Sequence, residues 1–148
     1  MRIIYCFIVS LLLFSCQNQT EPLLFEQMDG SITAIQFNNE VTNAEGFNIF
    51  NYRNFYNGGG VAIGDVNKDG LADVFLTANM GSNKLYLNQG NWQFQDISEQ
   101  AGIEQRNKWS TGVVMVDINN DQWLDIYVCN AGYSKGKDQK NALFINQQ

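Results

Sequence analysis

Apolar and polar positions follow the same order in two parts of the chain. Residues 59–64 and 74–79 are short apolar runs on either side of a polar loop at 65–73. Residues 113–116 and 126–130 flank a second polar loop at 117–125, which begins 52 residues after the first. Short runs rich in β-branched and aromatic residues, bounded by turn-forming residues, predict β-strands. Each polar loop is therefore predicted to join two strands.

The similarity between the two parts continues downstream of the loops. Residues 83–89 resemble residues 141–147 at a larger spacing, so an insertion is placed around residues 134–139. Strands are predicted at about 59–65, 74–79, 84–88 and 92–97, with one turn of helix capped by Ser98 after them. A repeat of about 40–50 residues is typical of a four-stranded propeller blade. The fold class predicted is all-β, with two stacked units.

Both polar loops carry oxygen-bearing side chains at positions one, three, five and nine. Calcium takes six to eight oxygen ligands, and a short loop supplies them from alternating side chains and a backbone carbonyl at position seven. The metal ligands predicted are Asp65, Asn67, Asp69, Leu71 and Asp73 in the first loop, and Asp117, Asn119, Asp121, Trp123 and Asp125 in the second. Leu71 and Trp123 would contribute their carbonyls. The alternative that remains open is turn chemistry without a metal.

The two loops differ at position six, where such loops bend sharply. The first loop has Gly70 there and the second has Gln122. A positive φ is expected at this position, and it costs a residue with a side chain about 1–2 kcal/mol. The second loop is therefore predicted to bind calcium more weakly, although Trp123 could pack over the loop and hold Gln122 in place.

Composition narrows the function further. The 148 residues carry a net charge of −6, and the six loop aspartates contribute to it. An acidic chain lacks the basic surface that binds nucleic acid, so no nucleic-acid partner is expected. The chain has no histidine. Cys129 therefore lacks the usual activating base, and its place in a predicted strand suggests a small buried hydrophobic residue.

The first 16 residues are interpreted as a lipoprotein signal peptide. Residues 3–14 form an apolar run that is too short to span a bilayer but suits a signal-peptide core. Cys16 follows Ser15 directly after this run and is predicted to be lipidated, which would anchor the exported chain to the outer membrane or cell surface. An ordinary secretory signal remains the alternative.

Residues 17–56 are predicted to form a tether and a leading strand segment, with alternation over residues 31–37 suggesting the strand. Residues 47–56 are dense in aromatic rings separated by asparagines. These rings form either a glycan-binding surface or, as we favour, part of the hydrophobic packing.

These features together resemble the FG-GAP/VCBS repeats of integrin-type β-propellers. The context is closer still to ASPIC/UnbV-associated VCBS-repeat lipoproteins of Bacteroidetes. The segments that carry the resemblance are 55–65, 83–88, 94–102 and 109–113, besides the two loops. The resemblance implies a calcium-stabilised propeller, with a first repeat at 57–108 and a truncated second repeat at 109–148. Two four-stranded blades make an incomplete propeller, so we expect the chain to be the N-terminal part of a longer protein.

Two functions are considered from the sequence. The first is a cell-surface binding, adhesion or polymer-capture module, stabilised by calcium, with an extracellular protein or glycan as partner. The alternative is part of an exported hydrolase or lyase that uses loop aspartates on polysaccharide. The aspartates are spaced to converge on one cation, and no catalytic motif is recognised, so we expect a module without catalytic residues.

Overall fold

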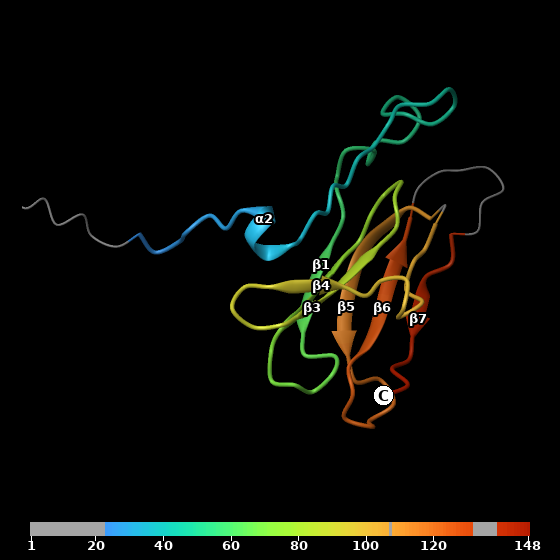
Figure 1. Cartoon of the computed structure of the whole chain (residues 1–148). Helices are drawn as coiled ribbons and strands as arrows, with labels where there is room; N and C mark the ends of the chain where they lie inside the picture. Colours follow the sequence, from blue (N-terminus) through green and yellow to red (C-terminus); the bar gives the residue numbers. More distant parts are fainter. Residues whose placement is uncertain (1–22, 107, 132–138) are drawn as a thin grey trace, which may run out of the picture.

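The computed structural model describes residues 23–106, 108–131 and 139–148 and is almost entirely β (Figure 1). The predicted signal peptide and Cys16 lie outside these residues. One four-residue helix, α2 (Gly30–Thr33), precedes the strands. The strands are β1 (Val61–Gly64), β2 (Asp73–Leu76), β3 (Lys84–Asn88), β4 (Phe94–Asp96), β5 (Ser110–Val116), β6 (Asp125–Asn130) and β7 (Ala142–Phe144). The all-β prediction is confirmed, and each of the four strands predicted for the first repeat is present.

The strands form two antiparallel sheets that follow the repeats. The first sheet has the order β1-β2-β3-β4, and the second has the order β5-β6-β7 within the described residues. Each strand pairs with its neighbour in sequence, as expected for a blade built from successive hairpins. The first repeat is therefore a complete four-stranded blade, and the second contributes three strands.

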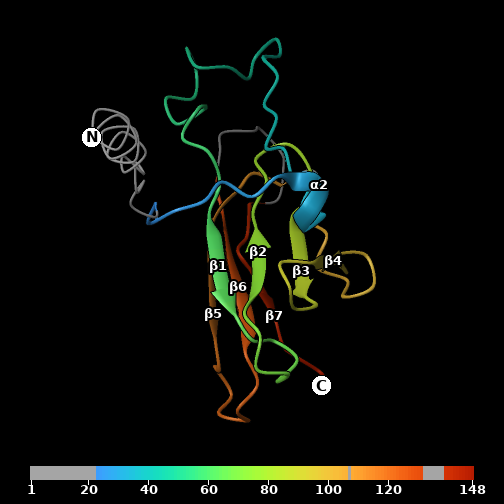
Figure 2. The same cartoon turned by 60° about the vertical axis from the view of Figure 1, so that its left-hand side comes forward.

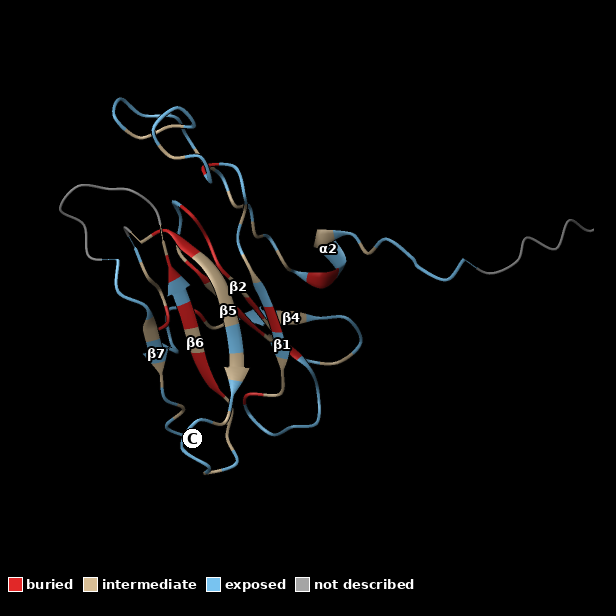
Figure 3. Cartoon of the chain, turned by 180° about the vertical axis from the view of Figure 1, so that it is seen from behind, coloured by how far each residue is buried: buried red, intermediate tan, exposed pale blue. Residues whose placement is uncertain are grey.

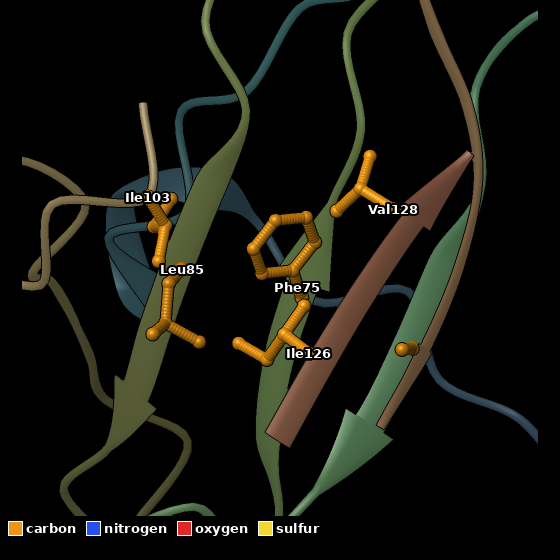
Figure 4. Packing of buried hydrophobic residues seen from close by; sticks show 6 residues of the cluster. Phe75, Leu85, Ile103, Ile126 and Val128 are labelled. Atoms are coloured by element: carbon orange, nitrogen blue, oxygen red, sulfur yellow. The ribbon is translucent and has the colours of Figure 1, made fainter. Parts of the chain in front are cut away.

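The two sheets pack face to face, and the core lies between them (Figure 3). Strand residues alternate between the two faces of a sheet, so one face of each sheet supplies the contacts. Phe75 of β2 and Val128 of β6 are fully buried and lie close to Ile126 (Figure 4). Leu85 and Ile103 extend the same cluster on the side of the first sheet.

The innermost strands β1 and β5 run side by side (Figure 2). Their approach depends on Gly60, directly before β1, because a Cβ at this position would lie 2.7 Å from the Thr111 carbonyl oxygen and 3.1 Å from the Gly112 Cα. Both atoms belong to the backbone of β5, so a side chain here would force the two strands apart.

Polar groups join the sheets at the end of β2. The Ser110 amide donates to the Ala78 carbonyl at 3.1 Å. The buried side chain of Asn79 donates from Nδ2 to the Ser110 carbonyl at 3.0 Å, and Thr77 Oγ1 donates to the Thr111 carbonyl at 3.2 Å. These bonds satisfy buried polar groups across the interface and fix the position of one sheet against the other.

Equivalent asparagines follow β2 and β6 but differ in one contact. Asn83 Oδ1 accepts from the Ala78 amide at 3.0 Å, and Asn141 Oδ1 accepts from the Asn130 amide at 2.9 Å. Asn141 Nδ2 also donates to Tyr127 Oη at 2.8 Å. In the first sheet Phe75 occupies the position of Tyr127. Among the described residues, the buried Asn83 Nδ2 accordingly has no hydrogen-bond partner.

The strand predicted over residues 31–37 is wrong. Asp29 accepts a hydrogen bond from the Ser31 amide at 2.7 Å and caps helix α2, which ends at Thr33 and is followed by Ala34 with φ 60°. The local cap therefore overrides the alternating pattern. The structure describes no helix that is long and apolar enough to cross a membrane.

The helix predicted after Ser98 is present only as one turn, in which the Ala101 amide donates to the Ile97 carbonyl at 2.8 Å. Ser98 does not cap this turn, because its hydroxyl accepts from the Leu85 amide at 2.9 Å. Ser98 is buried, so its side chain holds the chain after β4 against β3.

The aromatic residues before the first sheet pack against one another. Phe47 stacks with Tyr52 at a centroid distance of 5.6 Å and meets Trp109 edge-on at 4.9 Å. Phe55 is fully buried and also contacts Trp109. The packing interpretation of this segment therefore holds for these four rings, whereas Phe50 is 97% exposed.

Cys129 was expected to be buried, but it is exposed. Its side chain lies on the face of the second sheet that points away from the first sheet. No described element covers that face at this residue.

Candidate metal loops

The first loop is organised by hydrogen bonds from its backbone to its own side chains. Asp65 accepts from the Asp69 amide at 3.2 Å and from the Gly70 amide at 2.8 Å. Asn67 Oδ1 also accepts from the Asp69 amide, at 3.1 Å. Asp69 Oδ1 accepts from the Leu71 amide at 2.8 Å. These are Asx-type turns, which fix the backbone of the loop through its own side chains.

The second loop repeats this pattern bond for bond. Asp117 accepts from the Asp121 amide at 3.0 Å and from the Gln122 amide at 2.8 Å. Asn119 accepts from the Asp121 amide at 3.1 Å, and Asp121 accepts from the Trp123 amide at 2.9 Å. The two sequences therefore adopt the same local structure even though positions six and seven differ.

The backbone bends with positive φ at the position that the sequence indicated. Gly70 has φ 85° and Gln122 has φ 73°. Position four is also left-handed in both loops, with φ 60° at Lys68 and 63° at Asn120. The sequence analysis did not identify position four, although asparagine at one copy is a signal because it tolerates this conformation.

Position nine has a role that the sequence analysis missed. Asp73 is fully buried, and its two carboxylate oxygens accept from the Val66 amide and the Asn88 amide, both at 2.9 Å. Asp125 is also fully buried and accepts from the Ile118 and Asn146 amides at 3.1 and 2.8 Å. Each aspartate thereby ties the start of its loop to the end of the third strand.

The pKa values of two loop carboxyls move in opposite directions. Burial raises the pKa of Asp73, against the opposing effect of the Asn88 and Val66 amides. Hydrogen bonds from the Trp123 amide and Asn119 lower the pKa of the half-buried Asp121. Burial thus disfavours the charged form of Asp73, whereas hydrogen bonds favour the charged form of Asp121.

The two loops lie at the same end of the sheets and touch (Figure 2). The Lys68 ammonium of the first loop lies 4.2 Å from the centroid of the Trp123 ring in the second. Cation–π contacts of this kind stabilise by about 0.5–1 kcal/mol at exposed sites. Trp123 therefore packs under a residue of the other loop.

The candidate ligands of each loop are of the chemical kind that a hard cation prefers. Each loop offers aspartate, asparagine and a carbonyl, all of them oxygen donors. No three Asp, Glu, His or Cys side chains in the described parts of the chain form a metal-binding group as they stand. The three aspartates predicted as ligands in each loop therefore do not converge on one point in this conformation, and an ion bound by all three would have to draw them together.

A groove opens between the sheets beside the loops. Its volume is about 650 Å³, and its walls combine apolar side chains with exposed amides. Leu87, Ile97 and Phe144 contribute to the apolar part, and Gln95 and Gln100 to the polar part. Such a surface offers both stacking area and hydrogen bonds to a partner.

Comparison with known proteins agrees with this architecture. Cartilage acidic protein 1 from Mus musculus is 34% identical over 73 residues, which cover 49% of this chain and 11% of that protein. The Xenopus tropicalis and Homo sapiens proteins of the same name are each 33% identical, over 52% and 51% of this chain and 12% of their own lengths. The chain thus matches about an eighth or less of these relatives. A family model, the FG-GAP-like repeat, matches residues 65–128, from the first loop into β6. Residues 65–128 are therefore an FG-GAP-like repeat.

Proposed function

We propose that the chain is an exported, calcium-stabilised binding module with no catalytic role. The observation that carries this proposal is the pair of loops, which share one backbone path and one set of hydrogen bonds. Two copies of the same turn at the same end of adjacent sheets favour a structural role for the loops. FG-GAP-like repeats are typical of extracellular and surface proteins, and this supports export.

Calcium would bind the ten positions that the sequence indicates. In each loop the three aspartates and the asparagine would supply side-chain oxygens, and Leu71 or Trp123 would supply a carbonyl. The bound ion would offset the clustered negative charge and hold the ends of two strands together. Binding to the folded state alone would raise stability by about 2.7 kcal/mol at a calcium concentration of 100 times Kd.

The alternative of a polysaccharide hydrolase or lyase has less support. Asp73 and Asp125 are buried, and backbone amides occupy both carboxylate oxygens of each. Such carboxylates favour a structural role over proton transfer to a substrate. The groove between the sheets is the surface that we assign to an extracellular protein or glycan partner.

Anchoring through Cys16 completes the proposal. A lipid at this cysteine would place the two sheets at the outer membrane or cell surface, where a glycan or protein partner would be encountered. This step rests on the sequence of the first 16 residues.

Affinity electrophoresis against a panel of soluble polysaccharides, with calcium and with EDTA, tests the proposed function. We expect calcium-dependent retardation by at least one polymer without release of new reducing ends. Leu87→Arg in the groove should abolish the retardation, whereas Phe50→Lys, outside the groove, should not. Release of reducing ends that is lost in Asp69→Ala would favour the enzyme alternative. If no polymer retards the chain, the proposal of a glycan partner is wrong.

A further inference from the structure

Asn57 and Gly58 connect the aromatic segment, residues 47–56, to β1. The turn before them is held by the Asn57 amide, which donates to the Asn54 carbonyl at 3.2 Å. The side chain of Asn57 is exposed. In the part of the chain that the structure describes, neither this side chain nor the Gly58 amide makes a hydrogen bond. No hydrogen bond therefore has to break before these two neighbouring groups react with each other.

The surroundings of Gly58 leave space for such a reaction. Gly58 has φ 80°, a conformation that glycine adopts without steric cost. Nothing lies within 4 Å of the position that a Cβ would occupy. A side chain on the residue that follows an asparagine hinders attack of the backbone nitrogen on the side-chain amide, and glycine removes this hindrance. The site therefore combines an unbonded side-chain amide with an accessible, unbonded backbone nitrogen.

We propose that Asn57 is a site of spontaneous deamidation. The Gly58 nitrogen loses its proton and attacks the carbonyl carbon of the Asn57 side chain, and ammonia leaves as a succinimide ring closes. Water then adds to the ring and opens it. Opening at the former side-chain carbonyl gives aspartate, whereas opening at the main-chain carbonyl gives isoaspartate. Water is the co-reactant, and no group is oxidised or reduced.

Two other asparagines that precede a small residue show how the fold protects such sites. Asn43 and Asn130 are each followed by alanine, and the amide of that alanine donates to a backbone carbonyl at 3.1 and 2.8 Å, respectively. Asn43 also donates from Nδ2 to Tyr56 Oη at 3.0 Å, and Asn130 Oδ1 accepts from Ser110 Oγ at 2.9 Å. Attack at either asparagine would have to break these hydrogen bonds, which Asn57 and its neighbour lack.

The isoaspartate product would weaken the junction between the two sheets. The Gly58 carbonyl accepts from Asn79 Nδ2 at 3.0 Å, and the same nitrogen donates to the Ser110 carbonyl of the second sheet at 3.0 Å. The next residue, Gly59, passes so close to the Thr77 carbonyl that a Cβ there would clash with it. Isoaspartate adds one carbon atom to the main chain directly before Gly58, and this displaces the carbonyl that Asn79 binds. The reaction therefore limits the lifetime of the folded chain.

Incubation of the full chain at mildly alkaline pH in heavy-oxygen water, followed by peptide mapping with mass spectrometry, tests this proposal. We expect the amide nitrogen of Asn57 to be lost and heavy oxygen to be incorporated, with both aspartate and isoaspartate present. Asn43 and Asn130 should convert about tenfold more slowly or less, because attack there first breaks a hydrogen bond. Asn57→Gln should remove the modification, since glutamine would have to close a larger ring.

The same incubation in guanidinium chloride separates the effect of the fold from that of the local sequence. Asn57 should convert at similar rates in the folded and unfolded chain, whereas conversion of Asn130 should accelerate on unfolding. The converted chain should unfold at a lower urea concentration than the fresh chain, and Asn57→Gln should keep its midpoint through the incubation. A folded chain that leaves Asn57 intact while the unfolded chain converts overturns the proposed site. Equal midpoints before and after conversion overturn the weakening of the junction.

Discussion

Replacing Gln122 by glycine should stabilise the protein, and replacing Gly70 by glutamine should destabilise it. Both residues have positive φ, and both amides donate to the first aspartate of their loop at 2.8 Å. The two positions therefore differ mainly in residue type. A Cβ added at Gly70 would have no neighbour within 4 Å, so the expected effect comes from the backbone and not from a clash.

The magnitude follows from two opposing effects. A left-handed conformation costs a residue with a side chain about 1–2 kcal/mol. Glycine loses about 0.5–1 kcal/mol more than alanine on folding, because its unfolded chain is freer. Gln122→Gly should therefore raise the free energy of unfolding by about 0.5–1 kcal/mol, and Gly70→Gln should lower it by a similar amount.

Urea denaturation in EDTA measures both changes as shifts of the transition midpoint at constant slope. The exchanged variant, with both substitutions, should return to the stability of the wild type. If Gln122→Gly destabilises the protein by as much as Gly70→Gln does, the backbone argument fails, and the Gln122 side chain must stabilise its loop.

The same strain should appear in calcium affinity. A difference of 1.4 kcal/mol corresponds to about tenfold in a dissociation constant, so the second loop should bind perhaps 5–30 times more weakly than the first. In calorimetric titrations, Asp69→Ala should remove the tighter event, and Gln122→Gly should strengthen the weaker one. An unchanged or weaker second event in Gln122→Gly contradicts this prediction.

Three further predictions concern other contacts. Tyr127→Phe should lower the free energy of unfolding by about 1 kcal/mol in urea denaturation. Phe75→Tyr should lower it by less or raise it, because the new hydroxyl would meet the unpartnered Nδ2 of Asn83, and equal losses in the two variants refute this explanation. Burial raises the pKa of Asp96, but hydrogen bonds from Lys84 and Ser98 outweigh this effect and hold the pKa below 3.8. The stabilisation by the Asp96 carboxylate is therefore present above pH 3.8 and is lost as the pH falls through the pKa of the folded state. Asp96→Asn should therefore cost less than about 1 kcal/mol at pH 7, and this cost should shrink as the pH falls below 3.8; a cost that does not change with pH contradicts the assignment. Cys16→Ser should abolish labelling of cells by an alkyne fatty acid and release the chain from membranes, and retained labelling excludes the lipid anchor.

The sequence was informative where local residue types determine local structure. The strands on either side of each loop and the bend at Gln122 were predictable, because turn residues and β-branched runs act over a few positions. The repeat also predicted how the two sheets are related. Duplicate segments at matching spacings indicated that the sheets would pair their strands in the same way.

Features that depend on the rest of the fold were not predictable in this way. Residues 31–37 alternate as a strand does, yet a side-chain cap at Asp29 selects a helix. The prediction that Cys129 is buried was wrong, because which face of a sheet is covered depends on what packs against it. The bonds that Asp73 accepts from the Asn88 amide and that Asp125 accepts from the Asn146 amide were missed, although the matched asparagines at the end of the third strand of each repeat were a signal.

Calorimetric titration of the folded chain with calcium tests the central claim most directly. The two loops should give two binding events per chain, Asp69→Ala or Asp121→Ala should each remove one, and the double variant should give none while keeping its circular dichroism spectrum. Calcium should also raise the unfolding midpoint of the wild type and leave that of the double variant unchanged. A folded wild-type chain that gives no binding heat and no calcium-dependent shift would contradict the account.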